Sequence, residues 1–169
     1  MNRPSAAIGS ALFLVIAPGT VAGLVPWWIS RWHVRPPFFG MSAIRGLGVL
    51  LIAAGATILL DSFARFALQG LGTPAPVAPP RHLVVTGFYR FVRNPMYVAV
   101  FALVLGQALL LGSISLVSYA LVVWVGFSLF IYGYEEPTLR RQFGEEYTAY
   151  CANVHRWLPR LSPWKGKTP

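Results

Sequence analysis

Long apolar runs dominate the chain, and short stretches of charged and proline-rich sequence separate them. Four of these runs approach the roughly 20 apolar residues that a helix needs to cross a bilayer. They lie at about 8–29, 41–60, 94–112 and 116–134. The pattern predicts an all-α fold, a polytopic membrane helix bundle with about four transmembrane helices. Pro18 and Pro26 fall inside the first run, where they predict a kink or an irregular segment whose free backbone groups neighbouring helices satisfy.

Glycine and proline mark the connections between the runs. Gly112 and Ser113 predict a tight turn, so that the third and fourth runs form a helical hairpin. Segment 70–80, GLGTPAPVAPP, predicts an extended connection instead of a helix. We interpret residues 1–169 as a single domain. Residues 8–66 form its N-terminal helix pair, and residues 81–159 form the half that carries the polar motifs.

The sequence after the fourth run changes character and becomes amphipathic. Pro137 is well placed to begin a new helix, because the first turn of a helix needs no backbone donor there. Apolar side chains then recur at helical spacing; they are Leu139, Phe143, Tyr147 and Tyr150. We predict a C-terminal amphipathic helix that lies on the membrane or docks against the bundle.

Composition supports the membrane assignment and excludes several other classes. The chain of 169 residues is 56% hydrophobic, with a formal charge of +9, and its mean hydropathy is +0.58. The basic residues flank the apolar runs, which favours contact with anionic lipid headgroups over a nucleic-acid partner. The single cysteine, Cys151, excludes an intramolecular disulfide, and the scattered histidines make a metal site unexpected.

The distribution of charge predicts an orientation. Four crossings place both termini on one side of the membrane, and only Arg31, Arg35 and Arg45 fall on the other side. The positive-inside rule then places both termini and segment 81–93 in the cytoplasm, together with the amphipathic C-terminal helix.

The hairpin has a consequence for the polar residues at its open end. Because the third run leaves the cytoplasmic face and the fourth returns to it, RFVRNPMY and YGYEEP should meet at one depth. Glu135 and Glu136 would point about 100° apart on a helix. One of them could face a ligand while the other pairs with an arginine, although a surface pair of Glu136 with Arg140 is an alternative.

Two smaller patterns lie in the second run. Asp61 and Arg65 are four residues apart and could pair on one face. Small residues would allow close packing of this helix against another helix or in a homodimer. They are Gly46, Gly48, Ala53, Ala54, Gly55 and Ala56.

Two segments of the second half resemble one known family. LVVTGFYRFVRNPMYVA resembles the L-V-T-x-G-x-Y-R-x-x-R-[HN]-P-x-Y segment of the isoprenylcysteine carboxyl methyltransferases, and FGEEYTAYCANVHRWLP resembles the tail of that family. The match covers roughly Arg81 to Pro159, in the expected order around the hairpin. Related phospholipid N-methyltransferases share Asn-Pro-Met-Tyr and Glu-Glu-Pro elements, which stand here as NPMY and EEP.

The resemblance implies that S-adenosylmethionine is the methyl donor and binds at the cytoplasmic end of the bundle. It implies catalytic roles for Arg90, Arg93, Glu135 and Glu136. It also implies a cofactor pocket lined by Leu83, Val84, Gly87, Tyr89, Arg93, Asn94, Pro95, Tyr97, Glu135 and Glu136. In chemical terms, Arg93 suits a carboxylate, a glutamate suits ribose hydroxyls or an ammonium, and tyrosine faces suit a sulfonium.

The function that the resemblance implies is methylation of a small lipophilic acceptor, such as O-methylation of an isoprenylcysteine carboxylate. Asn94 stands where the eukaryotic enzymes carry a histidine, and FIYGY lacks the arginine that those enzymes have before the acid pair. These differences leave an amine, a thiol or another lipid open as the acceptor. A non-catalytic membrane transporter or assembly protein is the alternative from a different class.

Overall fold

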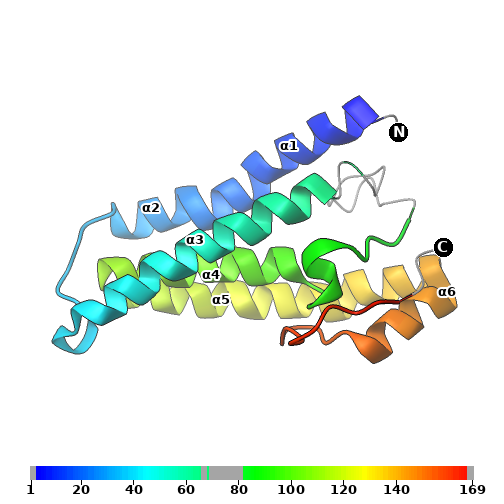
Figure 1. Cartoon of the computed structure of the whole chain (residues 1–169). Helices are drawn as coiled ribbons and strands as arrows, with labels where there is room; N and C mark the ends of the chain where they lie inside the picture. Colours follow the sequence, from blue (N-terminus) through cyan, green and yellow to red (C-terminus); the bar gives the residue numbers. More distant parts are fainter. Residues whose placement is uncertain (1–2, 66–67, 69–81, 167–169) are drawn as a thin grey trace.

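The computed structural model describes residues 3–65, 68 and 82–166 and shows a bundle of helices. Six α-helices follow one another: α1 Arg3–Gly19, α2 Val25–Ser30, α3 Ser42–Arg65, α4 Pro95–Leu111, α5 Ile114–Phe130 and α6 Glu136–Asn153. Two π-helical segments, Thr20–Leu24 and Ile131–Glu135, connect α1 to α2 and α5 to α6 (Figure 1). The described residues contain no strand, which confirms the all-α prediction. The predicted extended connection, 70–80, lies outside the described residues.

Helices α3 and α4 approach each other so closely that their backbones touch. A Cβ atom added to Gly48 would lie 2.7 Å from the carbonyl oxygen of Gly106, and one added to Gly55 would lie 2.8 Å from that of Ala99. Glycine therefore permits an approach that larger residues would prevent. Gly46 and Ala53, also predicted as packing residues, face outward and are exposed.

The first apolar run is helical from Arg3 to Ser30, and the predicted irregular segment is the π-helical turn. Pro26 has no N–H to donate to the carbonyl of Ala22, so the amide of Gln107 on α4 donates to this carbonyl at 2.7 Å. Val25 donates to Thr20 in the π register. This leaves the Val21 carbonyl for the Tyr119 hydroxyl on α5, at 3.0 Å.

The predicted C-terminal helix is present as α6, with Pro137 in its first turn. It is not set apart from the bundle, because the helical path continues from α5 through the second π-helical segment into α6. The change of direction comes later, at Gly144, whose φ of 52° only glycine adopts readily. Tyr147 and Tyr150 are then buried against the segment before α4, so that the second part of α6 docks on the bundle, as predicted for the amphipathic region.

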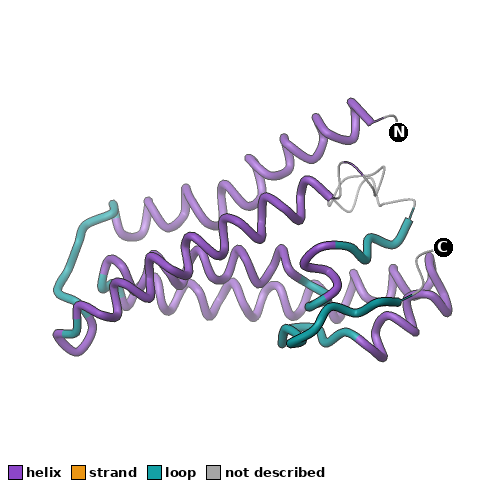
Figure 2. The backbone as a smooth tube through the Cα atoms, in the orientation of Figure 1, coloured by secondary structure: helices purple, strands orange, loops and turns teal. Residues whose placement is uncertain are grey.

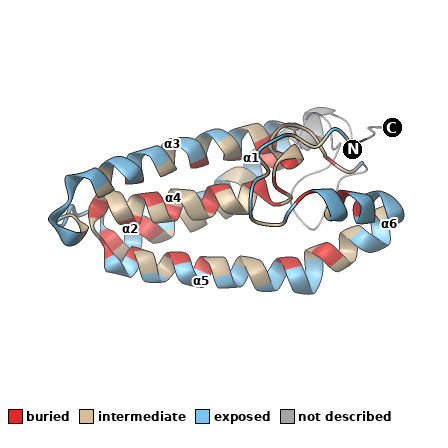
Figure 3. Cartoon of the chain, turned by 60° about the horizontal axis from the view of Figure 1, so that its bottom comes forward, coloured by how far each residue is buried: buried red, intermediate tan, exposed pale blue. Residues whose placement is uncertain are grey.

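The helices have the length and surface of an integral membrane protein. Three helical runs are long and apolar enough to cross a membrane, namely Ile8–Ser30, Ser42–Arg65 and Ile114–Asn153, whereas α4 is apolar but has 17 residues. Buried positions concentrate along α4, and the outer faces of α3 and α5 are exposed (Figure 3). Many of these exposed residues are large and apolar, as helices facing lipid require.

The loops gather at two opposite ends of the bundle (Figure 2). The connection from α2 to α3 and the turn at Gly112 lie at one end, where the Arg35 amide donates to the Leu111 carbonyl. The beginning of α1, segment 82–94 and the C-terminal segment lie at the other end (Figure 1). The hairpin of α4 and α5 therefore returns the chain to the end that carries most of the polar motif residues.

Candidate active site

The two ends of the hairpin meet as predicted. The Tyr97 hydroxyl, on the first turn of α4, donates to the Glu135 carboxylate at 2.5 Å. Beside it, Arg93 lies 3.2 Å from the Glu136 carboxylate. Residues about 40 positions apart thus share one site at the end of the membrane helices.

The two glutamates have different partners, which confirms that they point apart. Glu136 is buried and accepts two hydrogen bonds from Arg156, at 2.6 and 2.8 Å, in addition to its pairing with Arg93. Arg156 also donates to the Tyr132 hydroxyl at 2.8 Å and lies 4.0 Å from the centre of that ring. The bond to Glu136 raises the pKa of Arg156 and keeps its charge fixed. The alternative pairing of Glu136 with Arg140 is not the one observed.

Arg93 connects α4 to the end of α6. Its side chain is only 10% exposed, and one terminal nitrogen donates to the Cys151 sulfur at 2.7 Å. Its backbone amide donates to the carbonyl of His155 at 2.9 Å. The Nε atom of Arg93 is buried and has no hydrogen-bond partner among the described residues. A buried donor of this kind is suited to an acceptor group on a ligand.

The C-terminal segment runs antiparallel to residues 90–94 and closes the site from outside the bundle. The side chain of Arg90 donates to the Trp164 carbonyl at 2.7 Å, and the Trp164 amide donates to the Arg90 carbonyl at 2.9 Å. The Arg160 amide donates to the Phe91 carbonyl at 2.8 Å. Asn94 donates to the Arg156 carbonyl at 3.3 Å. Arg90 therefore binds the C-terminal segment, at a different place from Glu135 and Glu136.

The segment before α4 forms the remaining wall. Gly87 has a φ of 54°, and the Arg65 side chain occupies the space where a Cβ would lie. Tyr89 is buried, which raises the pKa of its phenol, and its carbonyl accepts from the Tyr150 hydroxyl at 2.6 Å. Val84 is buried, and Leu83 packs on the cluster around Tyr150. Pro95 is buried in the first turn of α4.

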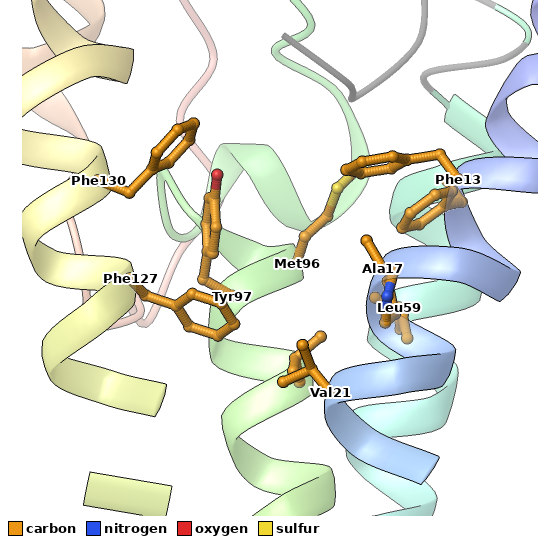
Figure 4. A pocket seen from close by; sticks show the side chains of 11 residues that line it. Phe13, Ala17, Val21, Leu59, Met96, Tyr97, Phe127 and Phe130 are labelled. Atoms are coloured by element: carbon orange, nitrogen blue, oxygen red, sulfur yellow. The ribbon is translucent and has the colours of Figure 1, made fainter. Parts of the chain in front are cut away.

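An apolar cavity of about 290 Å³ lies directly beside Tyr97 (Figure 4). Its lining comes from the first helical run and from α3, α4 and α5: Phe13, Ala17, Pro18, Val21, Leu59, Phe63, Met96, Tyr97, Val100, Phe127 and Phe130. The cavity was not predicted from the sequence, because its lining residues come from helices that are distant in the chain. The spacing of Phe13, Ala17 and Val21, four residues apart on one helical face, was the available signal.

These features define a class of protein: a helical integral membrane protein with a polar site at one end of the bundle and an apolar cavity leading to it. Residues 44–146 match the model of the phospholipid methyltransferase family. This match covers more than half of the chain, and the chain belongs to that family. The described residues hold no cluster of metal-binding side chains.

Curated relatives resemble part of the chain. A probable protein-S-isoprenylcysteine O-methyltransferase of Oryza sativa subsp. japonica is 41% identical over 78 residues, which are 46% of this chain and 40% of that protein. The protein-S-isoprenylcysteine O-methyltransferase of Schizosaccharomyces pombe is 41% identical over 82 residues, covering 47% and 34% of the two chains. Protein-S-isoprenylcysteine O-methyltransferase A of Arabidopsis thaliana is 37% identical over 78 residues, covering 46% and 39%. The chain thus spans well under half the length of these relatives.

Proposed function

We propose that the protein is an integral membrane methyltransferase that uses S-adenosylmethionine to methylate a small lipophilic acceptor. The observation that carries this proposal is the meeting of Tyr97 with Glu135, and of Arg93 with Glu136, beside an apolar cavity. Membership of the phospholipid methyltransferase family supports the reaction class. The names of the curated relatives support O-methylation of a carboxylate on an isoprenylated cysteine.

The polar residues present suit the donor molecule. The unpartnered Nε of Arg93 is a buried hydrogen-bond donor, which suits the carboxylate of the donor. Glu135 suits its ribose hydroxyls or its ammonium. The rings of Tyr89 and Tyr97 suit its cationic sulfur. When bound, S-adenosylmethionine supplies a methyl group on a positively charged sulfur, and the task of the protein is alignment.

The other predicted site residues have supporting roles in this proposal. Glu136 fixes Arg93 and Arg156, and Asn94 and Arg90 hold the C-terminal segment over the site. The backbone around Leu83, Val84, Gly87 and Pro95 shapes the wall of the pocket. Arg90, predicted as catalytic, thus acts as a positioning residue.

A second candidate is methylation of an amine, as in phospholipid N-methylation. The observation that favours it is the carboxylate of Glu135 bound to Tyr97 of the cavity lining, because a carboxylate attracts a cationic head and repels an anionic one. The two candidates predict chemically different products. A methyl ester is released by mild alkali, whereas an N-methyl group is retained.

The test has two parts. Titration of the purified protein with S-adenosylhomocysteine should show saturable binding, which Glu135→Gln and Arg93→Ala weaken by about tenfold or more. A radiolabelled methyl-transfer assay with membrane lipid extracts should then give a labelled lipid whose lability to alkali identifies the acceptor group. A folded protein that binds no S-adenosylhomocysteine would favour a non-catalytic membrane protein.

We also propose that both termini and the site face the cytoplasm. The described arginines Arg31, Arg35 and Arg45 lie at or beside the end of the bundle opposite the site, and the positive-inside rule places the richer end inside. A membrane-impermeant thiol reagent should label a cysteine introduced at Lys165 in inverted vesicles but not in intact cells. Labelling in intact cells alone would reverse the orientation.

A further inference from the structure

The cavity beside Tyr97 has almost entirely apolar walls and a single polar side-chain group. Its walls are aliphatic and aromatic side chains, and the hydroxyl of Tyr97 is the polar side-chain group among its lining residues. An occupant with polar atoms along its length would leave them without partners, at a cost of a few kcal/mol each. The cavity therefore suits an apolar tail whose single polar head lies at Tyr97.

The polar end of the cavity is held at a fixed position beside the site. The hydroxyl of Tyr97 donates to Glu135, and its ring meets the ring of Phe127 edge to face, with centroids 4.8 Å apart. In Figure 4 the Tyr97 hydroxyl lies near the ring of Phe130 and points away from Phe127 and Val21. A head group at Tyr97 would therefore lie beside Glu135, with the tail extending toward the first helical run.

One wall of the cavity lies outside the region that matches the family. We call Phe13, Ala17 and Pro18 of α1, together with Val21 of the π-helical segment that follows, the α1 wall. In Figure 4, Phe13, Ala17 and Val21 lie across the cavity from Phe127 and Phe130. The family match begins at residue 44, whereas the other lining residues all lie within it. The side of the cavity that the α1 wall supplies therefore lies outside the part of the chain that defines the family match.

The α1 wall is also held in position. Gln107 and Tyr119 bind the carbonyls of Ala22 and Val21, which the π-helical turn leaves free. Phe13 stacks on Phe63 of α3, with ring centroids 6.2 Å apart. A wall fixed at several points can select an occupant by size, because a closely packed wall does not yield freely to extra volume.

We propose that the cavity receives the apolar tail of the methyl acceptor and that the α1 wall determines which tail lengths the protein accepts. This inference rests on the proposed function. Ala17 is the smallest residue of the wall, so its side chain sets the free space at that point. Phe13 is the largest, and its removal extends the cavity.

The first experiment measures occupancy without catalysis. An N-acetylcysteine carrying an S-farnesyl tail with a diazirine at its distal end is irradiated with the protein in phosphatidylcholine nanodiscs, and the label is mapped by mass spectrometry. We expect label within residues 13–21, reduced about tenfold or more by Ala17→Phe. The matched control is Ile16→Phe, at an exposed position on the same helix, which should leave labelling unchanged. Equal labelling of both variants, or no label in this segment, would overturn the proposal.

The second experiment measures selectivity, using N-acetylcysteine with S-geranyl, S-farnesyl or S-geranylgeranyl tails as competitors of the photolabel. Ala17→Phe should weaken competition by the S-geranylgeranyl compound most, because it shortens the free space. Phe13→Ala should strengthen competition by the same compound. An unchanged order in both variants would overturn the proposal that the α1 wall determines the accepted tail length. Binding of S-adenosylhomocysteine is measured in parallel. If the wild-type protein does not bind S-adenosylhomocysteine, the proposed function is contradicted, while the occupancy result can still be interpreted. If it binds S-adenosylhomocysteine but shows no selectivity for tail length, only the present inference is contradicted.

Discussion

The region that matches the family and the first helical run are held in place by different kinds of interaction. In the matched region, α3 and α4 touch backbone to backbone at Gly48 and Gly106, and the buried Glu136 pairs with Arg93 there and with Arg156 beyond the end of the match. The first run has a long exposed apolar face, and two side-chain bonds to its π-helical turn attach it to α4 and α5. The matched region thus fixes the polar site, whereas the first helical run supplies one wall of the apolar cavity.

The matched region and the first helical run can therefore change independently of each other. A polar site built on paired charges is intolerant of substitution, since each buried charge needs its partner. An apolar wall tolerates exchange of one hydrophobic residue for another if volume is respected. Changes in the first run should therefore alter which acceptor fits, and changes around Glu136 should alter whether the site forms at all.

The largest effect on stability is expected for Glu136→Ala. This change leaves Arg93, only 10% exposed, and Arg156, 24% exposed, without their carboxylate. Breaking a buried ion pair costs about 3–5 kcal/mol. Because Arg156 reaches solvent, we expect the lower limit, about 3 kcal/mol, measured as a fall in the free energy of unfolding in detergent. Glu145→Ala, at an exposed position on the same helix, serves as control and should change it by less than about 0.5 kcal/mol. Equal losses in both variants would contradict the buried cluster.

A smaller but clear effect is expected for Gly48→Ala. The added Cβ would lie 2.7 Å from two backbone atoms of α4, so the two helices must separate. Overpacking of this kind costs about 1–3 kcal/mol. The matched control is Gly46→Ala on the same helix, where the added Cβ meets nothing within 4 Å. That change should be neutral or slightly stabilising, since alanine favours the helix by about 0.5–1 kcal/mol. A thermal unfolding series compares the two, and similar midpoints would mean that α3 and α4 are not in close contact.

The helical hairpin and the partners at its open end could be predicted from the sequence. Apolar run length gave the helices, and the turn at Gly112 required that Tyr97 and Arg93 meet the acid pair. The different directions of Glu135 and Glu136 followed from the helical period. The role of Arg156, which binds Glu136 through both carboxylate oxygens, was not predicted, because residues 20 apart beyond a bend share no periodicity.

Two features of the fold depended on information that local patterns do not contain. Pro137 correctly indicated the start of α6, but it did not show that a π-helical segment joins α6 to α5 without a break. The bend occurs at Gly144, and none of the neighbouring residues indicates that this glycine has a positive φ. The cavity likewise depends on how four segments pack together, and the sequence alone does not show which faces enclose it.

An effect of about 1 kcal/mol is expected for Gln107→Leu. The carbonyl of Ala22 loses its donor, and Pro26 cannot replace it. Side-chain hydrogen bonds between membrane helices contribute about 0.6–1.7 kcal/mol. Because this change frees the first run and leaves Glu135 and Glu136 untouched, the affinity for S-adenosylhomocysteine should stay at the wild-type value while labelling of residues 13–21 falls. Tyr119→Phe, which removes the second bond, should act in the same direction. A matching loss of cofactor affinity would show that the two parts are not independent.

The smallest effect is expected for Asp61→Asn at the end of α3. Asp61 and Arg65 form a pair four residues apart at 2.7 Å, and both side chains are about 30% exposed, so solvent screens their attraction. Such helix pairs contribute about 0.3–0.5 kcal/mol. The Arg65 side chain also occupies the space beside Gly87, and Arg65→Met keeps part of that packing without the charge. If thermal unfolding shows that both variants lose only a few tenths of a kcal/mol, the segment before α4 owes its position to Tyr150 and α6. A loss as large as that of Glu136→Ala would instead make this pair a second anchor of the site.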